Sequence, residues 1–228
     1  MRILVVTATP QEVAPLVAGF GPASGDAFQS RLQSFSVRSH DIDVLHAGVG
    51  MVPTAVWCAR ALAAARYDLA LNLGVCGSFD PKIAPGAVVH IVSEQMSELA
   101  AEDGDHLVTM QELGLIGENE APFAGGCLVN ARPPANRVLA ALPPVRGISV
   151  NTVHGNERSI AAVVRRFDPQ VESMEGAAFM YACLTHALPF AEVRAVSNIV
   201  ERRDRSRWKM AEAIASLGVK ARELVESL

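Results

Sequence analysis

The chain has 228 residues, half of them hydrophobic, and a formal net charge of −4. This length can bury a sizeable core, and we predict a single domain over residues 1–228. Acidic and basic residues are interspersed and no basic stripe carries aromatics, which argues against nucleic acid as a partner. No apolar run reaches about 18 residues, and the Ile3 to Val6 run is too short for a signal peptide, so we expect no membrane partner and a cytoplasmic location.

The cysteines and histidines show no pattern typical of a metal site. The four cysteines are scattered and contain no C-x-x-C pair, and none of the six histidines has metal-type spacing to a partner. Neither G-x-G-x-x-G nor a Walker sequence is present, which argues against a dinucleotide or triphosphate site. We therefore expect buried, reduced thiols and no cofactor or metal.

The first elements place an acidic residue at the end of a buried strand. Arg2 to Ala8 is a continuous β-branched run, as in a central strand covered on both faces. Thr9 is a suitable N-cap and Pro10 a suitable first helical residue, so Glu12 falls in the first turn of the next helix. An acid there either complements the helix dipole or serves a site.

A hairpin and two glycine-containing turns follow. We predict strands at 33–37 and 42–46, a turn at Ala47 to Gly50, a helix over 52–66 and a strand over 69–73. The first turn could hold an anion on its N–H groups or be a plain tight turn. In Gly74 to Phe79, glycines bracket a place where the backbone passes close to something bulky. Within it Cys76 is a poor nucleophile, because nothing nearby in sequence lowers its pKa.

The second half of the chain alternates strands with helices. We predict strands at 87–92, 126–129 and 147–151, and an acidic, loop-rich segment over 94–120 that serves as a flap or a dimer contact. A last helix over 207–225 is expected to pack one set of side chains inward, namely Trp208, Ala211, Ile214, Ala215, Leu217 and Val219.

The most informative stretch runs from Val171 to Trp208. It is typical of a strand (171–174), a small-residue helix that begins at Glu175, and a second strand (190–196) followed by Ser197 and Asn198. Ligands of open α/β sheets bind at the carboxyl ends of strands. Glu175 and Asn198 stand at two such ends, so we predict a site there.

The same stretch carries a resemblance to a known family. SMEGAA followed by RAVSN resembles the purine nucleoside phosphorylase and nucleosidase superfamily. SN-x-V-x-x-R-x-x-x-x-W resembles futalosine hydrolases more than methylthioadenosine/S-adenosylhomocysteine nucleosidases, which carry SD at that place. The resemblance covers nearly the whole chain. It implies a three-layer α/β/α fold with a central mixed, largely parallel twisted sheet, and a homodimer or a higher even-numbered oligomer.

The resemblance also implies roles for particular residues. It makes Glu12 the base that activates water, and it places Glu175, with the backbone of Met174, on the ribose hydroxyls. Buried in the neighbouring strand, Arg194 would fix the two glutamates, or it forms a purely structural ion pair. The remaining positions are expected to contact substrate, namely Cys76, Gly77, Val153, His154 and Arg203.

Two positions near the expected substrate depart from the family, and two others keep alternatives open. Val153 replaces an aromatic that would stack on the purine, and Val75 stands where related enzymes carry a serine. The backbone of His154 would address the base edge, although a lone histidine is more often a structural residue. Arg203 would face a carboxylate on the 5′ substituent, or it anchors the last helix.

Asn198 indicates which purine leaves. A 6-oxopurine presents two acceptors, N7 and O6, and an ionised aspartate would face both with like polarity. A carboxamide can donate to either and can accept from N7–H after protonation. Asn198 therefore favours a 6-oxopurine such as hypoxanthine. The resemblance to futalosine hydrolases implies that this base is released from futalosine, a 5′-modified inosine, in menaquinone biosynthesis.

Three functions remain open on the sequence alone. The first is a nucleosidase, of the futalosine type or the methylthioadenosine type. The second is a phosphorylase, which the sequence disfavours because Thr9-Pro10-Gln11-Glu12 replaces the usual G-D-P-x-R turn. The third is a non-catalytic nucleoside-binding protein, which the joint presence of Glu12, Glu175 and Arg194 argues against.

Overall fold

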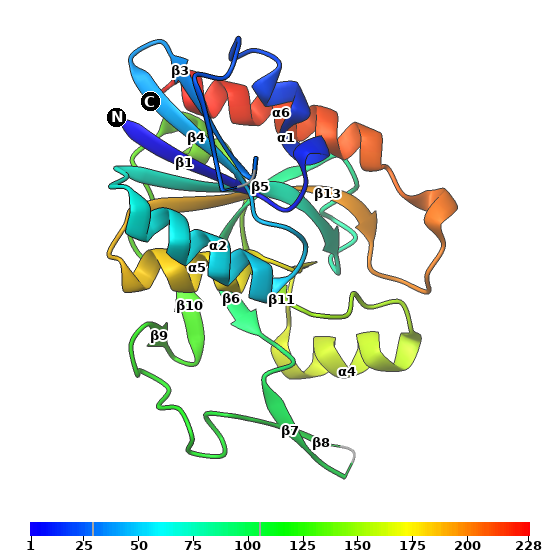
Figure 1. Cartoon of the computed structure of the whole chain (residues 1–228). Coiled ribbons are helices and arrows are strands. Elements are labelled where there is room, and N and C mark those ends of the chain that lie inside the picture. Colours follow the sequence, from blue (N-terminus) through cyan, green and yellow to red (C-terminus); the bar gives the residue numbers. More distant parts are fainter. Residues whose placement is uncertain (29, 105) are drawn as a thin grey trace.

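A mixed β-sheet with helices on both faces forms the centre of the molecule (Figure 1). The computed structural model describes residues 1–28, 30–104 and 106–228. The predicted α/β fold with a central mixed sheet is confirmed. The extent of the single domain predicted over residues 1–228 stays a prediction.

The elements alternate along the chain, as the sequence predicts. The strands are β1 (Arg2–Thr7), β2 (Gly25–Ala27), β3 (Leu32–Val37), β4 (His40–His46), β5 (Leu69–Ser78), β6 (Val88–Met96), β7 (Ala100–Asp103), β8 (His106–Thr109), β9 (Phe123–Ala124), β10 (Cys127–Val129), β11 (Pro144–Ser149), β12 (Val171–Ser173) and β13 (Phe190–Ile199). The helices are α1 (Pro10–Val17), α2 (Met51–Ala64), α3 (Arg137–Ala141), α4 (Glu157–Phe167), α5 (Gly176–Thr185) and α6 (Met210–Glu226), with a 3₁₀ turn η1 (Arg205–Arg207).

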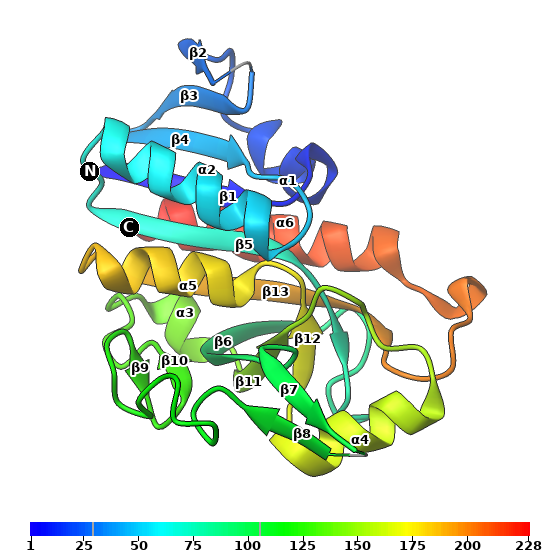
Figure 2. The ribbon, with the colours of Figure 1, turned by 60° about the horizontal axis from the view of Figure 1, so that its bottom comes forward.

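The β1 strand shows why its sequence is apolar throughout. Ile3 and Val5 belong to one core cluster, together with residues of α1 and α6. Leu4 and Val6 belong to a second cluster, together with residues of α2 and α5. Successive side chains of a strand point to opposite faces, so a strand covered on both sides needs an unbroken apolar run. Figure 2 shows α2 beside α5 on one side and α6 on the other.

The pairing of the strands closes part of the sheet on itself. The β5 strand pairs with β12 and with β13, β13 also pairs with β6, and β11 joins β6 to β12. Five strands thus form a ring, and β5 also continues through β1, β4 and β3 to the β2 edge. The β5–β13 pairing shifts register between Val196 and Asn198, which leaves Ser197 unpaired in the ladder with β5.

The glycine segment after Leu73 was predicted as a turn, and that prediction is wrong. The segment Gly74 to Ser78 continues β5 and pairs with β13 throughout. A Cβ on Gly74 would lie 2.4 Å from Nη1 of Arg194. Glycine at this position therefore lets the Arg194 guanidinium come close to the backbone of the strand. The expected bulky neighbour is present, but beside a strand rather than a turn.

Two further differences concern the second half of the chain. The 94–120 segment contains the β7–β8 hairpin, which sequence patterning did not reveal. The last helix begins at Met210, and its buried face consists of Ala213, Leu217, Gly218, Ala221, Leu224 and Val225, which confirms the prediction for Leu217. Ala211, Ala215 and Val219 are exposed. Alanine occurs on buried and exposed helix faces alike, so it does not mark the buried face. Placing the start of the helix at residue 207 also shifted the expected apolar stripe.

Candidate active site

A cavity of about 260 Å³ lies where β1, β5, β12 and β13 end. Most of its lining residues come from these strand ends and from the segments that follow them, as expected for a sheet of this kind. They are Ala8, Thr9, Glu12, Val49, Val75, Cys76, Gly77, Val153, His154, Glu172, Ser173, Met174, Glu175, Ser197, Asn198, Trp208 and Met210. The cavity thus brings together eight of the ten predicted site residues, all but Arg194 and Arg203.

Glu12 is held by hydrogen bonds at the inner end of the cavity. Its Oε2 accepts from the Thr9 backbone N–H at 2.8 Å and from the hydroxyls of Thr7 and Thr9 at 3.0 and 3.2 Å. Its Oε1 accepts a single hydrogen bond, from the Val75 N–H at 3.1 Å. A carboxylate oxygen offers about two acceptor sites. Oε1 is therefore the oxygen with capacity left for a ligand or a water molecule.

Arg194 lies behind the cavity and orients Glu175. The guanidinium is 1% exposed, and its Nη1 lies 3.2 Å from Oε2 of Glu175. Oε1 of Glu175 accepts from the Gly50 N–H at 3.0 Å, which fixes the second oxygen. Burial lowers the pKa of Arg194, but the carboxylates of Glu192, Glu175 and Glu12 outweigh it and raise the pKa above its ordinary value. The arginine is therefore a permanent cation beneath the two predicted catalytic glutamates.

Two further buried glutamates complete this cluster. Glu192, two residues before Arg194 on the same face of β13, accepts from its Nε at 2.9 Å. A Cβ on Gly176 would lie 2.6 Å from Oε1 of Glu192 and 2.3 Å from Oε1 of Glu94. Burial, followed by the charge of Glu192, raises the pKa of Glu94 well above its ordinary value, and burial also raises that of Glu192. Both shifts favour the protonated form of the carboxyl group.

Asn198 lies at the other end of the cavity, in β13 just beyond the register shift. Its Oδ1 accepts from the Ser197 hydroxyl at 2.8 Å, and its Nδ2 donates to the Ile199 carbonyl at 3.0 Å. A Cβ on Gly77 would lie 3.3 Å from this Nδ2. Among the described residues, only Ser197 and Ile199 form hydrogen bonds with the carboxamide. A ligand can therefore replace these hydrogen bonds at a modest cost in binding free energy.

Glu172 and His154 form a second pair at this end. The His154 N–H donates to Oε1 of Glu172 at 3.0 Å, and its ring Nδ1 lies 2.6 Å from Oε2. The predicted use of the His154 backbone on the base edge therefore competes with Glu172, which already accepts a hydrogen bond from the His154 N–H. The ring also packs edge-on against Phe79, with centroids 6.0 Å apart.

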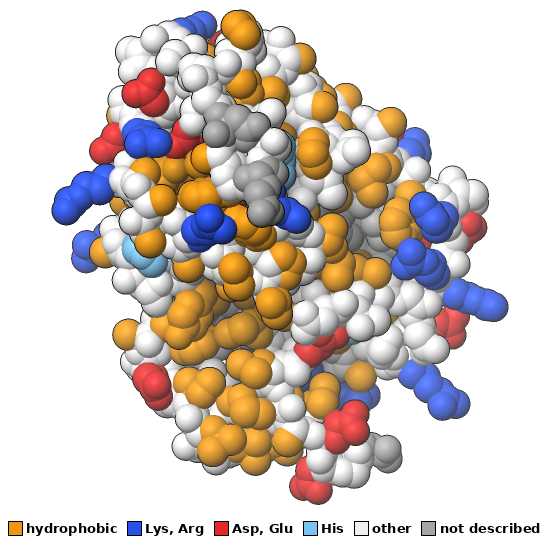
Figure 3. Space-filling view, in the orientation of Figure 1, with side chains coloured by type: hydrophobic (Ala, Val, Ile, Leu, Met, Phe, Trp, Pro, Cys, Tyr) orange, Lys and Arg blue, Asp and Glu red, His pale blue; other side chains and the backbone are white. Residues whose placement is uncertain are grey.

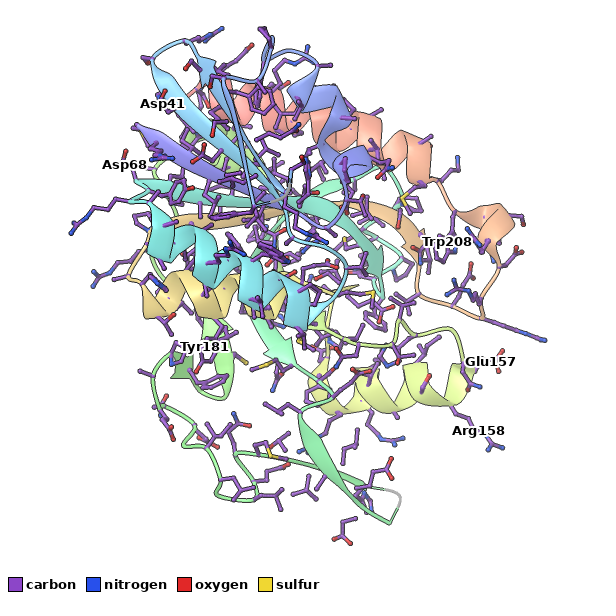
Figure 4. All side chains as sticks on the ribbon, viewed as in Figure 1. Asp41, Asp68, Glu157, Arg158, Tyr181 and Trp208 are labelled. Carbon is purple, nitrogen blue, oxygen red and sulfur yellow. The ribbon has the colours of Figure 1, made fainter. Side chains whose placement is uncertain are left out.

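Cys76 and Arg203 differ from the other predicted residues. Burial raises the pKa of the Cys76 thiol to about 12, so the thiolate needed for nucleophilic attack is not formed near neutrality. Arg203 is exposed and lies in a neighbouring hollow, with its guanidinium carbon 5.1 Å from the centroid of the Trp208 ring. Trp208, labelled in Figure 4, stands on the segment between β13 and α6 and lines the main cavity.

Sequence reasoning missed Glu172, Glu192 and Glu94. Each is a buried charged residue within a strand, and charged residues are rarely buried without a partner. The alternation Glu192-Val193-Arg194 also places both charges on one strand face. The sequence shows these charges and the alternation in β13. It does not show the partners of Glu172 and Glu94, which lie 18 and 55 residues away along the chain.

The described residues contain no cluster of three or more His, Cys, Asp or Glu side chains able to hold a metal ion. Among the helices of the same residues, none is long and apolar enough to cross a membrane.

Comparison with known proteins identifies the family. The model of the phosphorylase superfamily matches residues 2–228. A futalosine hydrolase from Streptomyces coelicolor is 32% identical, with 95% of this chain and 92% of that protein covered, and one from Acidothermus cellulolyticus is 30% identical, with 95% and 87% covered. A solved futalosine hydrolase structure from Helicobacter pylori superposes with a TM-score of 0.84 over 100% of this chain and 98% of that one, at 14% identity, which supports the fold. The chain belongs to the phosphorylase superfamily and, within it, to the futalosine hydrolase family.

Proposed function

We propose that this protein hydrolyses the N-glycosidic bond of futalosine, releasing hypoxanthine and dehypoxanthine futalosine in menaquinone biosynthesis by the futalosine pathway. One observation carries the proposal: a single cavity holds two anchored carboxylates at one end and Asn198 at the other. The first end suits a sugar and a water molecule, and the second suits a 6-oxopurine. The cytoplasmic location expected from the sequence stays a prediction.

Glu175 is assigned to the ribose. Arg194 and the Gly50 N–H hold its two oxygens, and each oxygen keeps an acceptor site for a sugar hydroxyl. Cleavage passes through a sugar with oxocarbenium character, and a fixed carboxylate stabilises the positive charge that develops. Because the arginine is buried and held by Glu192, the position of the carboxylate is set before substrate binds.

Glu12 is assigned to the water molecule. Its Oε1 carries the free acceptor site and accepts the proton as the water oxygen bonds to the anomeric carbon. The bond from that carbon to N9 breaks, and its electron pair leaves with the purine. Asn198 donates a hydrogen bond to the leaving base and so stabilises its negative charge.

Two other reactions of this superfamily are less well supported. In a phosphorylase, phosphate would replace the water, but that place is next to the Glu12 carboxylate, which repels an anion. A methylthioadenosine-type nucleosidase would release a 6-aminopurine, which the carboxamide of Asn198 does not favour.

Release of purine, measured with and without phosphate, separates these reactions. We expect futalosine to yield hypoxanthine at the same rate in both conditions, as followed by liquid chromatography and mass spectrometry. Strict dependence on phosphate would establish a phosphorylase. Release of adenine from methylthioadenosine at a higher kcat/KM than hypoxanthine from futalosine would establish the other nucleosidase. A tightly bound nucleoside that is never cleaved would indicate a binding protein.

The 5′ substituent of futalosine ends in a benzoate, for which we propose Arg203. Its guanidinium lies over the Trp208 ring, which lines the cavity, so it stands outside the mouth within reach of a long substituent. Changing Arg203 to Gln is expected to raise KM for futalosine and leave kcat unchanged. An equal rise in KM for inosine, which lacks the benzoate, would show that Arg203 does not bind the benzoate.

We also propose a homodimer as the unit of assembly. Val52, Val56 and Tyr181 are 73%, 58% and 41% exposed on neighbouring faces of α2 and α5, and Val49, at 55%, also lines the cavity. Figure 3 shows apolar side chains gathered over this side of the molecule. Such a patch is typical of an interaction surface, and closed two-fold dimers are the commonest oligomers. A monomeric mass by light scattering at micromolar concentration would contradict the proposal.

A further inference from the structure

The cation behind the cavity is paired with a carboxylate that the reaction described above does not use. Glu192 is 0% exposed and does not line the cavity. Its Oε1 accepts from Nε of Arg194 at 2.9 Å, whereas Nη1 of the same guanidinium lies 3.2 Å from Oε2 of Glu175. Arg194 therefore contacts one carboxylate at each of two edges, and of these two carboxylates only Glu175 lines the cavity.

Glu12 also stands close to this cation. The space that a Cβ on Gly74 would fill is bordered by Nη1 of Arg194 and by Oε1 of Glu12, the oxygen assigned to the water molecule. A positive charge beside a carboxylate favours its ionised form, which makes it a weaker base. The same charge also opposes the positive charge that develops on the sugar. Arg194 thus holds Glu12 and Glu175 in place but offsets their charge, unless another anion balances the guanidinium.

We propose that Glu192 is this anion, a positioning residue that acts through Arg194: its charge balances the guanidinium, so that Glu12 and Glu175 keep their negative charge toward the water and the sugar. The proposal rests on the proposed function and deepens it, because it names a group outside the cavity that sets the charge of the site. Burial lowers the pKa of Arg194, and among the carboxylates that raise it Glu192 has the largest effect.

The neighbouring Glu94 is the neutral member of the pair. Oε1 of Glu94 and Oε1 of Glu192 both border the space that a Cβ on Gly176 would fill, so the two groups lie close together beneath the start of α5. Glu192 contacts the guanidinium, whereas the hydrogen-bond partner of Glu94 among the described residues is the Ser149 hydroxyl. Burial raises the pKa of both groups, well above its ordinary value for Glu94, and the charge and hydrogen bond of Arg194 oppose the rise for Glu192. Two adjacent buried carboxylates repel each other, so the one that lacks contact with the cation takes a proton.

Binding of two matched nucleosides that the enzyme does not cleave tests this balance of charge. The neutral probe is 9-deazainosine, in which a carbon–carbon bond joins base and ribose. The cationic probe has the same base and hydroxyls, but a protonated nitrogen replaces the ring oxygen. Calorimetry would give the ratio of the two Kd values on the wild type, on Glu192→Gln and on the matched buried control Glu94→Gln. Glutamine keeps the size of the side chain and can still accept from Nε of Arg194.

The expected result is a loss of charge preference in one variant. We expect the wild type to prefer the cationic probe and Glu192→Gln to lose about 10-fold of this preference, while its affinity for the neutral probe stays unchanged. Glu94→Gln should match the wild type, and Glu192→Asp, which restores the charge, should recover the preference. Equal weakening of both probes in Glu192→Gln would indicate a merely structural role and overturn the proposal, because Glu175 is assigned to hydroxyls that both probes carry. An unchanged preference in Glu192→Gln, or a loss of preference in Glu94→Gln, would overturn it as well.

Infrared spectroscopy tests the same assignment without a change at Glu192. At neutral pH the wild type should show the carbonyl stretch of a buried, protonated carboxyl group, and Glu94→Gln should lack it. Absence of this band from the wild type, or its persistence in Glu94→Gln, would overturn the assignment of the negative charge to Glu192. Failure of the proposed function looks different: futalosine would stay intact, while the preference for the cationic probe and its dependence on Glu192 would persist.

Discussion

The two ends of the cavity are built in different ways. At the sugar end, Arg194 is buried among carboxylates from three elements, and Gly50, Val75 and Thr9 supply backbone donors to them. At the base end, among the described residues, the Asn198 side chain forms hydrogen bonds only with Ser197 and Ile199, and His154 holds Glu172. The comparison teaches that, in the proposed mechanism, the chemistry would rest on a rigid, cross-linked cluster, whereas the choice of base would rest on a few side chains with local partners.

If the sugar end is a rigid cluster, removing its cation should have the largest effect on the protein. Arg194→Met leaves Glu192 and Glu175 buried without their partner, which should lower the free energy of unfolding by about 3–5 kcal/mol. Urea unfolding measures this change. The control is Arg146→Met, whose ion pair with Asp168 is exposed and should contribute less than about 1 kcal/mol. Similar losses of unfolding free energy in the two variants would mean that the buried cluster stabilises the fold no more than the exposed ion pair does.

The next largest effect should fall on catalysis alone. Glu12→Gln and Glu175→Gln each remove charge rather than volume, so we expect folded proteins whose kcat for futalosine falls by at least ~10². The matched control is Glu157→Gln, on the exposed start of α4, which should keep wild-type kcat. Turnover near the wild-type rate in Glu12→Gln would move the base to another residue.

A substitution at the base end should instead change substrate specificity, with little loss of folding stability. Asn198→Asp should reduce the preference for futalosine over its 6-amino counterpart, aminofutalosine, by about 10-fold, a shift of about 1.4 kcal/mol. The shift should be greatest at mildly acidic pH, where the carboxyl can still be protonated and donate. Steady-state kcat/KM values for futalosine, aminofutalosine, inosine and methylthioadenosine measure it. Equal wild-type rates on the 6-oxo and 6-amino substrates would defeat the argument from Asn198.

The smallest expected effect is a change in how stability depends on pH. The pKa of Glu94 is raised above 4.5 in the folded protein, so the folded state holds this proton more firmly than the unfolded chain does. The stabilisation this provides is complete below pH 4.5 and is lost as pH rises toward the folded pKa. Glu94→Gln keeps a neutral group in place, so its stability relative to the wild type should increase with pH above 4.5. Parallel stability curves for the two proteins would show that Glu94 carries no raised pKa.

The sequence by itself determined most of the layout. The apolar run of β1 indicated a strand covered on both faces, and Thr9-Pro10 fixed the start of α1 and so the position of Glu12. These features are local, because capping and strand periodicity depend on residues a few positions apart. The same holds for Glu175 at the start of α5 and Asn198 near the end of β13.

Only the tertiary structure decided which groups meet. Gly74 was predicted as part of a turn, but it lies in β5 and pairs with β13. A glycine is required there because the Arg194 guanidinium occupies the space of a side chain. The pairing of Glu172 with His154, and the approach of Glu94 to Glu192, join segments that are distant along the chain. Local patterns carry no information about such partners. The ring of β5, β13, β6, β11 and β12 brings them together, because each pairing fixes the register of side chains that no sequence spacing relates.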